Sequence, residues 1–132
     1  MPHIAHLGDV VVVRPEGDIN HREMAAVKNA ITELMRERES RVVLDLGEVD
    51  HVNYMTVGVL VERAGRLRRT GGDLRLAGLS GYLKDIFRFS GVHHLFAAYD
   101  TVVEAVASFA GEAAASATVS AGTSGSWVPQ MH

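Results

Sequence analysis

Seven histidines are the first residues of this sequence that could do chemistry, because imidazole is the commonest side-chain ligand of protein-bound metals. His93 and His94 are adjacent, and neighbouring side chains of an extended segment point to opposite sides. No His-Glu-x-x-His spacing is present. Four others are spread over the N-terminus and separate loops: His3, His6, His21 and His51. We therefore expect no specific metal site and no cofactor.

Two acidic residues, Asp45 and Asp50, flank a segment that we predict to be a loop, where catalytic acids are often found. Asp45 continues an apolar strand, so its carboxylate needs a partner or a solvated edge, and we interpret it as structural. The sequence has no nucleophile elbow, phosphate loop or dinucleotide-binding glycine pattern, and Gly71-Gly72 is interpreted as a helix stop. These observations predict that the protein is not an enzyme.

Four arginines, Arg63, Arg66, Arg68 and Arg69, fall within one predicted helix. We expect them on its outer face, where such side chains are usually solvated. The alternative is that this basic face meets an acidic partner or lipid headgroups.

The bulk composition fits one intracellular domain. The chain has 132 residues, of which 47% are hydrophobic, and this is enough for a packed core. A formal net charge of −3 gives no general attraction to nucleic acid. There is no cysteine, the N-terminus lacks a basic region followed by an apolar stretch, and apolar runs are short. We expect a cytoplasmic protein without membrane insertion.

The elements that must position these residues alternate between strands and helices. Apolar runs predict strands at 10–13 and 41–46, alternation predicts one at 73–77, and shorter strands are expected at 4–7 and 94–97. The segment 47–56 is expected to be a loop. Apolar spacing predicts helices that begin near Asn20, Thr56, Ser80 and Asp100 or Thr101. Two helices have the inner stripes Val57, Leu60, Val61, Ala64 and Leu67, and Val102, Val103, Val106 and Phe109. The order β-β-α-β-α-β-α-β-α predicts an α/β fold with a mixed, mostly parallel sheet and about four helices.

The composition divides the chain into a domain and a tail. Residues 1–111 carry all the predicted elements. Residues 112–132 are rich in Ala, Ser, Thr and Gly, which is typical of a flexible segment, although Trp127 is an aromatic residue that can dock on a domain.

Several collinear segments between residues 4 and 110 resemble the STAS domain family of anti-sigma factor antagonists. The strand and loop Arg41-Val-Val-Leu-Asp-Leu-Gly-Glu-Val-Asp-His-Val-Asn53 are similar to those of the family. So are the turn Gly17-Asp18-Ile19, the helix start Val57-Gly58-Val59-Leu60, and the later segments 71–80, 89–92 and 95–96. The resemblance implies a single STAS-like domain that binds another protein.

The chain departs from the family at the loop before the second predicted helix. Antagonists carry Asp-Ser-Ser-Gly or Asp-Ser/Thr there, and partner kinases phosphorylate the first serine. This chain has Asn53, Tyr54, Met55 and Thr56. The phenol oxygen of Tyr54 lies several ångströms farther from the backbone than a serine hydroxyl, so the usual serine switch is not expected to operate.

The resemblance places the partner-binding site at Asn53, Tyr54, Met55 and Thr56, with His21 and His51 on the surface nearby. Tyr54 and Met55 are residue types favoured at interfaces, but each could instead fold back onto the core. Thr56 is a candidate phosphorylation site at a helix N-terminus, although its hydroxyl is more simply interpreted as a helix cap.

The resemblance leaves two binding functions open. The first is a regulatory module whose partner is an anti-sigma factor kinase or another STAS-containing protein. The second is an accessory subunit of a lipid or solute transporter. Homodimerisation is also compatible with the sequence.

Overall fold

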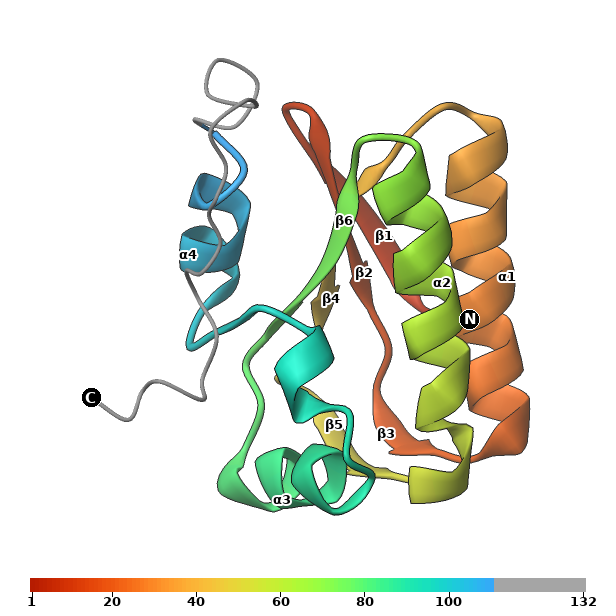
Figure 1. Ribbon diagram of the computed structural model, residues 1–132, viewed down its shortest axis with the longest axis vertical. Helices are drawn as coiled ribbons and strands as arrows, with labels where there is room; N and C mark the ends of the chain where they lie inside the picture. Colours follow the sequence, from red (N-terminus) through yellow and green to blue (C-terminus); the bar gives the residue numbers. More distant parts are fainter. Residues whose placement is uncertain (111–132) are drawn as a thin grey trace.

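A computed structural model describes residues 1–110 and contains two β-sheets (Figure 1). The larger sheet has the order β1-β2-β4-β6-β7; β1 is antiparallel to β2, and the other neighbours are parallel. Its strands are β1 (His3–Leu7), β2 (Val10–Arg14), β4 (Arg41–Asp45), β6 (Asp73–Ala77) and β7 (Ala98–Tyr99). The smaller sheet pairs β3 (Gly17–Ile19) with β5 (Val49–Val52) in parallel.

Within residues 1–110, four α-helices and two short 3₁₀ helices accompany the two sheets. Helices α1 and α2 cover one face, α4 covers the other, and α3 lies at one end beside β5 (Figure 1). The bounds are α1 (His21–Arg36), η1 (Tyr54–Thr56), α2 (Val57–Arg69), α3 (Gly81–Phe89), η2 (His93–Leu95) and α4 (Val102–Ala107). The predicted α/β class, with a mostly parallel sheet and four helices, is confirmed.

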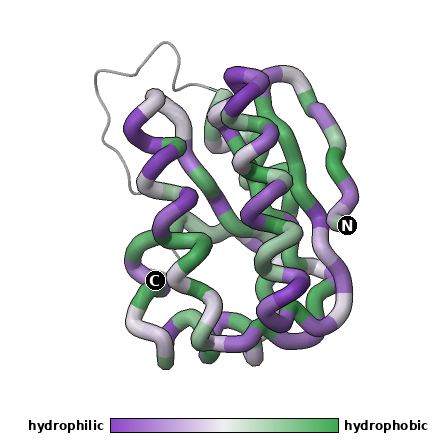
Figure 2. Tube along the Cα trace, turned by 90° about the vertical axis from the view of Figure 1, so that its right-hand side faces the viewer, coloured by the Kyte–Doolittle hydropathy of each residue, from purple (hydrophilic) through white to green (hydrophobic). Residues whose placement is uncertain are grey.

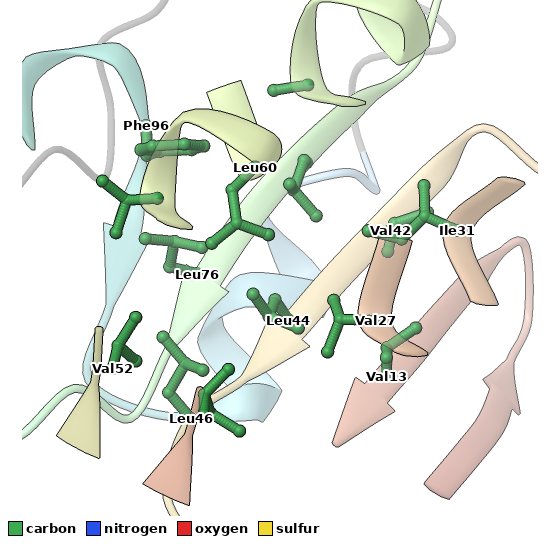
Figure 3. Packing of buried hydrophobic residues seen from close by; sticks show 14 of the residues in the cluster. Val13, Val27, Ile31, Val42, Leu44, Leu46, Val52, Leu60, Leu76 and Phe96 are labelled. Atoms are coloured by element: carbon green, nitrogen blue, oxygen red, sulfur yellow. The ribbon is translucent and has the colours of Figure 1, made fainter. Parts of the chain in front are cut away.

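The valine run of β2 is apolar throughout because both faces of the sheet are covered. Val11 and Val13 lie in the main core with side chains of α1 and α2. Figure 3 shows Val13 near Val27 of α1. Val10 and Val12 face the other way, into a smaller cluster with Phe109. All four valines are buried.

Helix ends follow the capping signals in the sequence. The side-chain oxygen of Asn20 accepts hydrogen bonds from the backbone N–H groups of Arg22 and Glu23, at 3.0 and 3.1 Å. Ser80 and Thr101 cap α3 and α4 in the same way. At the end of α2, a Cβ added to Gly72 would lie 1.8 Å from the carbonyl oxygen of Ser40, so only glycine fits there.

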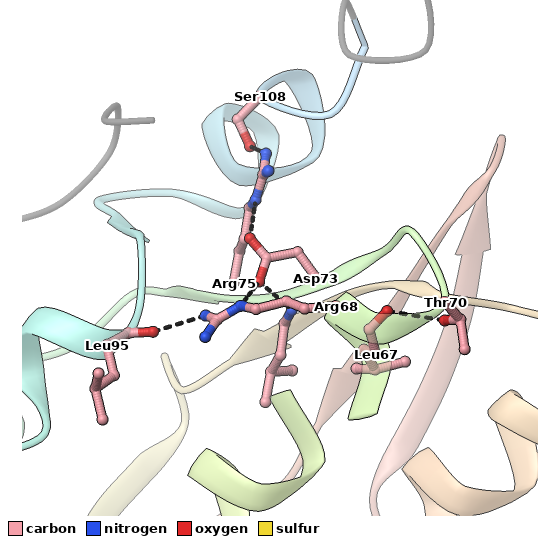
Figure 4. A network of polar contacts seen from close by, with 8 residues as sticks. Leu67, Arg68, Thr70, Asp73, Arg75, Leu95 and Ser108 are labelled. Atoms are coloured by element: carbon pink, nitrogen blue, oxygen red, sulfur yellow. Dashed lines mark hydrogen bonds and ion pairs between the residues drawn. The ribbon is translucent and has the colours of Figure 1, made fainter. Parts of the chain in front are cut away.

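A buried arginine of β6, Arg75, connects the end of α4 to the sheet (Figure 4). The Arg75 guanidinium donates to the Ser108 hydroxyl at 2.8 Å and to the Asp73 carboxylate at 2.9 Å. Its carbon lies 4.0 Å from the centre of the Phe109 ring. Asp73 also accepts from Arg68 of α2, at 2.7 Å. These contacts compensate the desolvation of the Arg75 cation and join α2, β6 and α4.

Two predicted segments have a different local structure. The loop expected at 47–56 contains β5 and η1, because Val49 and Val52 are buried against the core while the residues between them are not. The prediction of a strand at 94–97 is wrong. The 3₁₀ helix η2 occupies His93–Leu95, and the parallel strand forms at Ala98–Tyr99, where Ala98 and Tyr99 pair with Leu76 and Ala77.

Two side chains lie on the opposite side from that predicted. Arg63 was expected on the outer face of α2 but is buried. Its guanidinium donates to the Thr32 hydroxyl of α1 and to the Glu62 carboxylate. The hydrogen bond from Arg63 lowers the pKa of Glu62 from its ordinary value. In α4, Val103 is 77% exposed, and Ala105 takes the buried position instead.

The predicted tail, 112–132 with Trp127, lies outside the described residues, so the expected boundary at 111 stays a prediction. Within residues 1–110, no helix combines the length and apolar character needed to cross a bilayer.

Candidate docking site

The loop that precedes α2 is a fixed 3₁₀ turn that presents two large side chains to solvent. The backbone N–H of Asn53 donates to the carbonyl of Ile19 at 3.0 Å, which ties the loop to the end of β3. The side-chain oxygen of Asn53 accepts from the N–H of Met55 at 2.9 Å. Tyr54 and Met55 are 60% and 71% exposed. Neither folds back onto the core, so both are free to contact a partner.

Thr56 lies beneath this turn. Its side chain is buried, with 4% exposure for the residue, and its hydroxyl donates to the carbonyl of Asn53 at 2.7 Å. No side-chain capping bond forms at the start of α2, so the predicted cap is wrong. The hydroxyl closes the turn instead. This burial argues against Thr56 as a phosphorylation site, because the turn must open before a kinase can reach the oxygen.

His51 connects the turn region to α3. Its Nδ1 lies 2.6 Å from the phenol oxygen of Tyr82, and the two rings stack with centroids 5.6 Å apart. His51 belongs to β5 and Tyr82 to the first turn of α3, so this pair fixes the helix against the smaller sheet.

A groove of about 590 Å³ lies between β5, η1 and α3. Its lining is mostly apolar and aromatic: His51, Val52, Tyr54, Tyr82, Asp85, Ile86 and Phe89. Tyr82 is 53% and Phe89 is 86% exposed. Large apolar side chains that gather in this way on a surface mark an interaction site. We call the groove together with Met55 the docking face.

The structure brings together some of the predicted site residues and separates others. Tyr54 and His51 line the groove, Met55 is the exposed residue that follows Tyr54 in the turn, and Asn53 positions the turn. His21 is the exposed first residue of α1 and does not line the groove.

Sequence reasoning missed the contribution of α3. Tyr82 and Phe89 are seven residues apart, which places them two turns apart on the same face. Asp85 lies between them on that face, opposite the buried Leu83 and Phe87. The signal was a helix with apolar residues on both faces, which indicates a second surface that needs a partner.

The remaining candidates for chemistry do not line the groove. Asp45 ends β4, and its carboxylate accepts the N–H of Gly47 at 2.9 Å, which closes the turn after the strand. His93 and His94 meet edge to face. Within the described part of the chain, no group of three or more His, Cys, Asp or Glu side chains could hold a metal ion.

Comparison with known proteins identifies the family to which this fold belongs. The STAS family profile matches residues 1–105, and the chain therefore belongs to the STAS domain family. BtrV of Bordetella bronchiseptica, a candidate anti-sigma factor antagonist, is 28% identical over 94 residues, which are 71% of this chain and 81% of BtrV. An anti-sigma F factor antagonist of Paenibacillus polymyxa is 22% identical over 102 residues, with coverage of 76% and 87%.

Solved structures agree with this fold. The anti-sigma factor antagonist SpoIIAA in its unphosphorylated form superposes with a TM-score of 0.73 at 18% identity, over 84% of this chain and 97% of SpoIIAA. An anti-sigma factor antagonist from Mycobacterium paratuberculosis also has a TM-score of 0.73 at 18% identity, with coverage of 82% and 92%.

Proposed function

We propose that this protein is a non-enzymatic, cytoplasmic regulatory module that binds another protein through the docking face. Its partner is an anti-sigma factor kinase or another STAS-containing protein. Binding occupies the partner and so releases whatever the partner inhibits. The relatives that are named as anti-sigma factor antagonists support this choice over the transporter subunit, which no feature of the docking face favours.

The observation that carries the proposal is the exposure of Tyr54 and Met55 at the turn where the family carries its phosphorylated serine. A 3₁₀ turn held at both Asn53 and Thr56 presents these side chains in a fixed geometry. Preorganisation of this kind lowers the entropic cost of binding. Tyrosine and methionine also add apolar contact area that a serine lacks.

We further propose that binding is not switched by phosphorylation of this turn. In relatives, a phosphate on serine adds roughly two negative charges and repels the partner. Here Tyr54 occupies that position, and the nearest aliphatic hydroxyl belongs to Thr56, which is buried and already bonded. The protein is therefore expected to bind its partner constitutively.

The test begins with capture of the partner from the native cell and its identification. The purified partner is then incubated with the chain and ATP, and phosphate on the chain is measured by mass spectrometry. We expect a stable complex and no phosphate on residues 53–56. Tyr54→Ser should weaken binding without restoring phosphorylation, because Asn53 and Thr56 still differ from the family pattern. Stoichiometric phosphate on Thr56 with release of the partner would show that the switch had moved along the turn.

A further inference from the structure

Strand β1 lies at the edge of the larger sheet, and none of its five side chains is buried. Figure 2 shows the strand that leads from the N-terminus along the margin of the molecule. Ile4 is 42% and Leu7 is 48% exposed. The segment His3–Leu7 contains no Lys, Arg, Asp, Glu or Pro, the residues that commonly protect a sheet edge against further pairing.

The hairpin geometry determines which backbone groups of β1 face outward. Leu7 and Val10 flank a two-residue turn in which Gly8 has a φ of 64°. The carbonyl of Leu7 therefore accepts from the N–H of Val10, which makes this a hydrogen-bonded pair. Such pairs alternate along an antiparallel ladder, so His3 and Ala5 also bond to β2. Ile4 and His6 then direct their N–H and C=O groups away from the sheet.

We propose that β1 pairs with β1 of a second copy of this chain, in antiparallel register about a two-fold axis at Ala5. In this register Ile4 faces His6 of the partner subunit, and His6 faces Ile4 of the partner subunit. Each pair exchanges two backbone hydrogen bonds, so the edge gains four. Ala5 faces Ala5 of the partner subunit, and its small side chain permits the close approach of a non-hydrogen-bonded pair.

A second copy fits this edge for two reasons. The outward groups lie symmetrically on either side of Ala5, so the strand is complementary to itself, as an isologous contact requires. Pairing also covers the exposed Ile4 and Leu7 side chains of both copies. The edge shares no residue with the docking face, so the dimer would present two docking grooves at once.

Sedimentation of the full chain tests for the dimer. Five paired residues make a small interface, so we expect weak association, with the mass rising toward twice that of the monomer up to about 500 µM. Ile4→Lys places a charge at the edge, and His6→Pro removes an outward N–H without removing a bond to β2. Both variants should stay monomeric with unchanged circular dichroism. Val103→Lys also introduces a lysine at an exposed β-branched residue, but on α4, and should not change the association.

Single-cysteine variants test the register, because the chain has no cysteine of its own. In the proposed register, Ala5→Cys places two Cα atoms about 4.5 Å apart, within disulfide range. His3→Cys places them roughly 13 Å apart or more, which is too far. We expect Ala5→Cys to form disulfide-linked dimers at least about tenfold faster than His3→Cys. A chain that stays monomeric at about 500 µM would overturn the proposal. So would equal rates for the two variants, or a dimer unaffected by both Ile4→Lys and His6→Pro.

Discussion

Removal of the Phe109 ring should loosen α4 from the sheet. Phe109 is 2% exposed, packs with Val10, Val12 and Val43, and lies under the Arg75 guanidinium. Truncation of a buried phenylalanine to alanine costs about 3–5 kcal/mol, and a cation–π contact of this kind contributes about 1 kcal/mol of that loss. Because Phe109 follows the last turn of α4, the helix end can relax, so we expect about 3 kcal/mol for Phe109→Ala.

The assay for this prediction is equilibrium urea unfolding followed by circular dichroism. The matched control is Val103→Ala, since Val103 belongs to the same helix and is 77% exposed. The control should change the free energy of unfolding by less than about 0.5 kcal/mol. A loss below about 1 kcal/mol for Phe109→Ala would refute the reasoning, because α4 would then not belong to the cooperative unit.

Three further predictions concern the fold. Gly72→Ala should destabilise the domain by at least about 2 kcal/mol, measured by urea unfolding, because its methyl group would collide with the carbonyl of Ser40. Arg63→Met should destabilise the domain near neutral pH. Because Arg63 lowers the pKa of Glu62 in the folded state, the stability due to this pair is fully present above the ordinary pKa of 4.5 and is lost as the pH falls through the lowered value. Urea unfolding at a series of acidic pH values checks this. Truncation after Gly111 should shift the melting temperature by only a few degrees, and a loss above about 3 kcal/mol would indicate that Trp127 contributes to the folded domain.

The sheet could be predicted because strands β2 and β4 are apolar on both faces. The valines of β2 and the run Val42–Leu44 of β4 left no other interpretation, and Asn20, Ser80 and Thr101 marked three helix starts. Strand β5 was missed because only its end residues are apolar, and its pairing with β3 depends on contacts distant in sequence. The last strand is two residues long, too short for any periodic signal.

The sequence predicted only part of the candidate site. The turn at 53–56 was placed by resemblance, but its wall on α3 was not, because exposed aromatic residues such as Tyr82 and Phe89 cannot be told from core residues by type alone. Arg63 occupies a buried position between Leu60 and Leu67 in α2, whereas its charge had led us to predict an exposed side chain. Its partner Thr32, on α1, could be recognised only after the two helices were placed together.

The most direct test of the proposed docking face is the affinity of the Tyr54→Ala variant for the identified partner, measured by isothermal titration calorimetry. An aromatic anchor in an interface commonly contributes at least about 2 kcal/mol, so we expect binding about thirtyfold weaker. Phe89→Ala, on the opposite wall of the groove, should also weaken binding, whereas Val103→Ala should not. Because Tyr54 is 60% exposed, its variant should melt like the unmodified protein. If a folded Tyr54→Ala variant bound the partner with unchanged affinity, the proposal that Tyr54 contacts the partner would be contradicted.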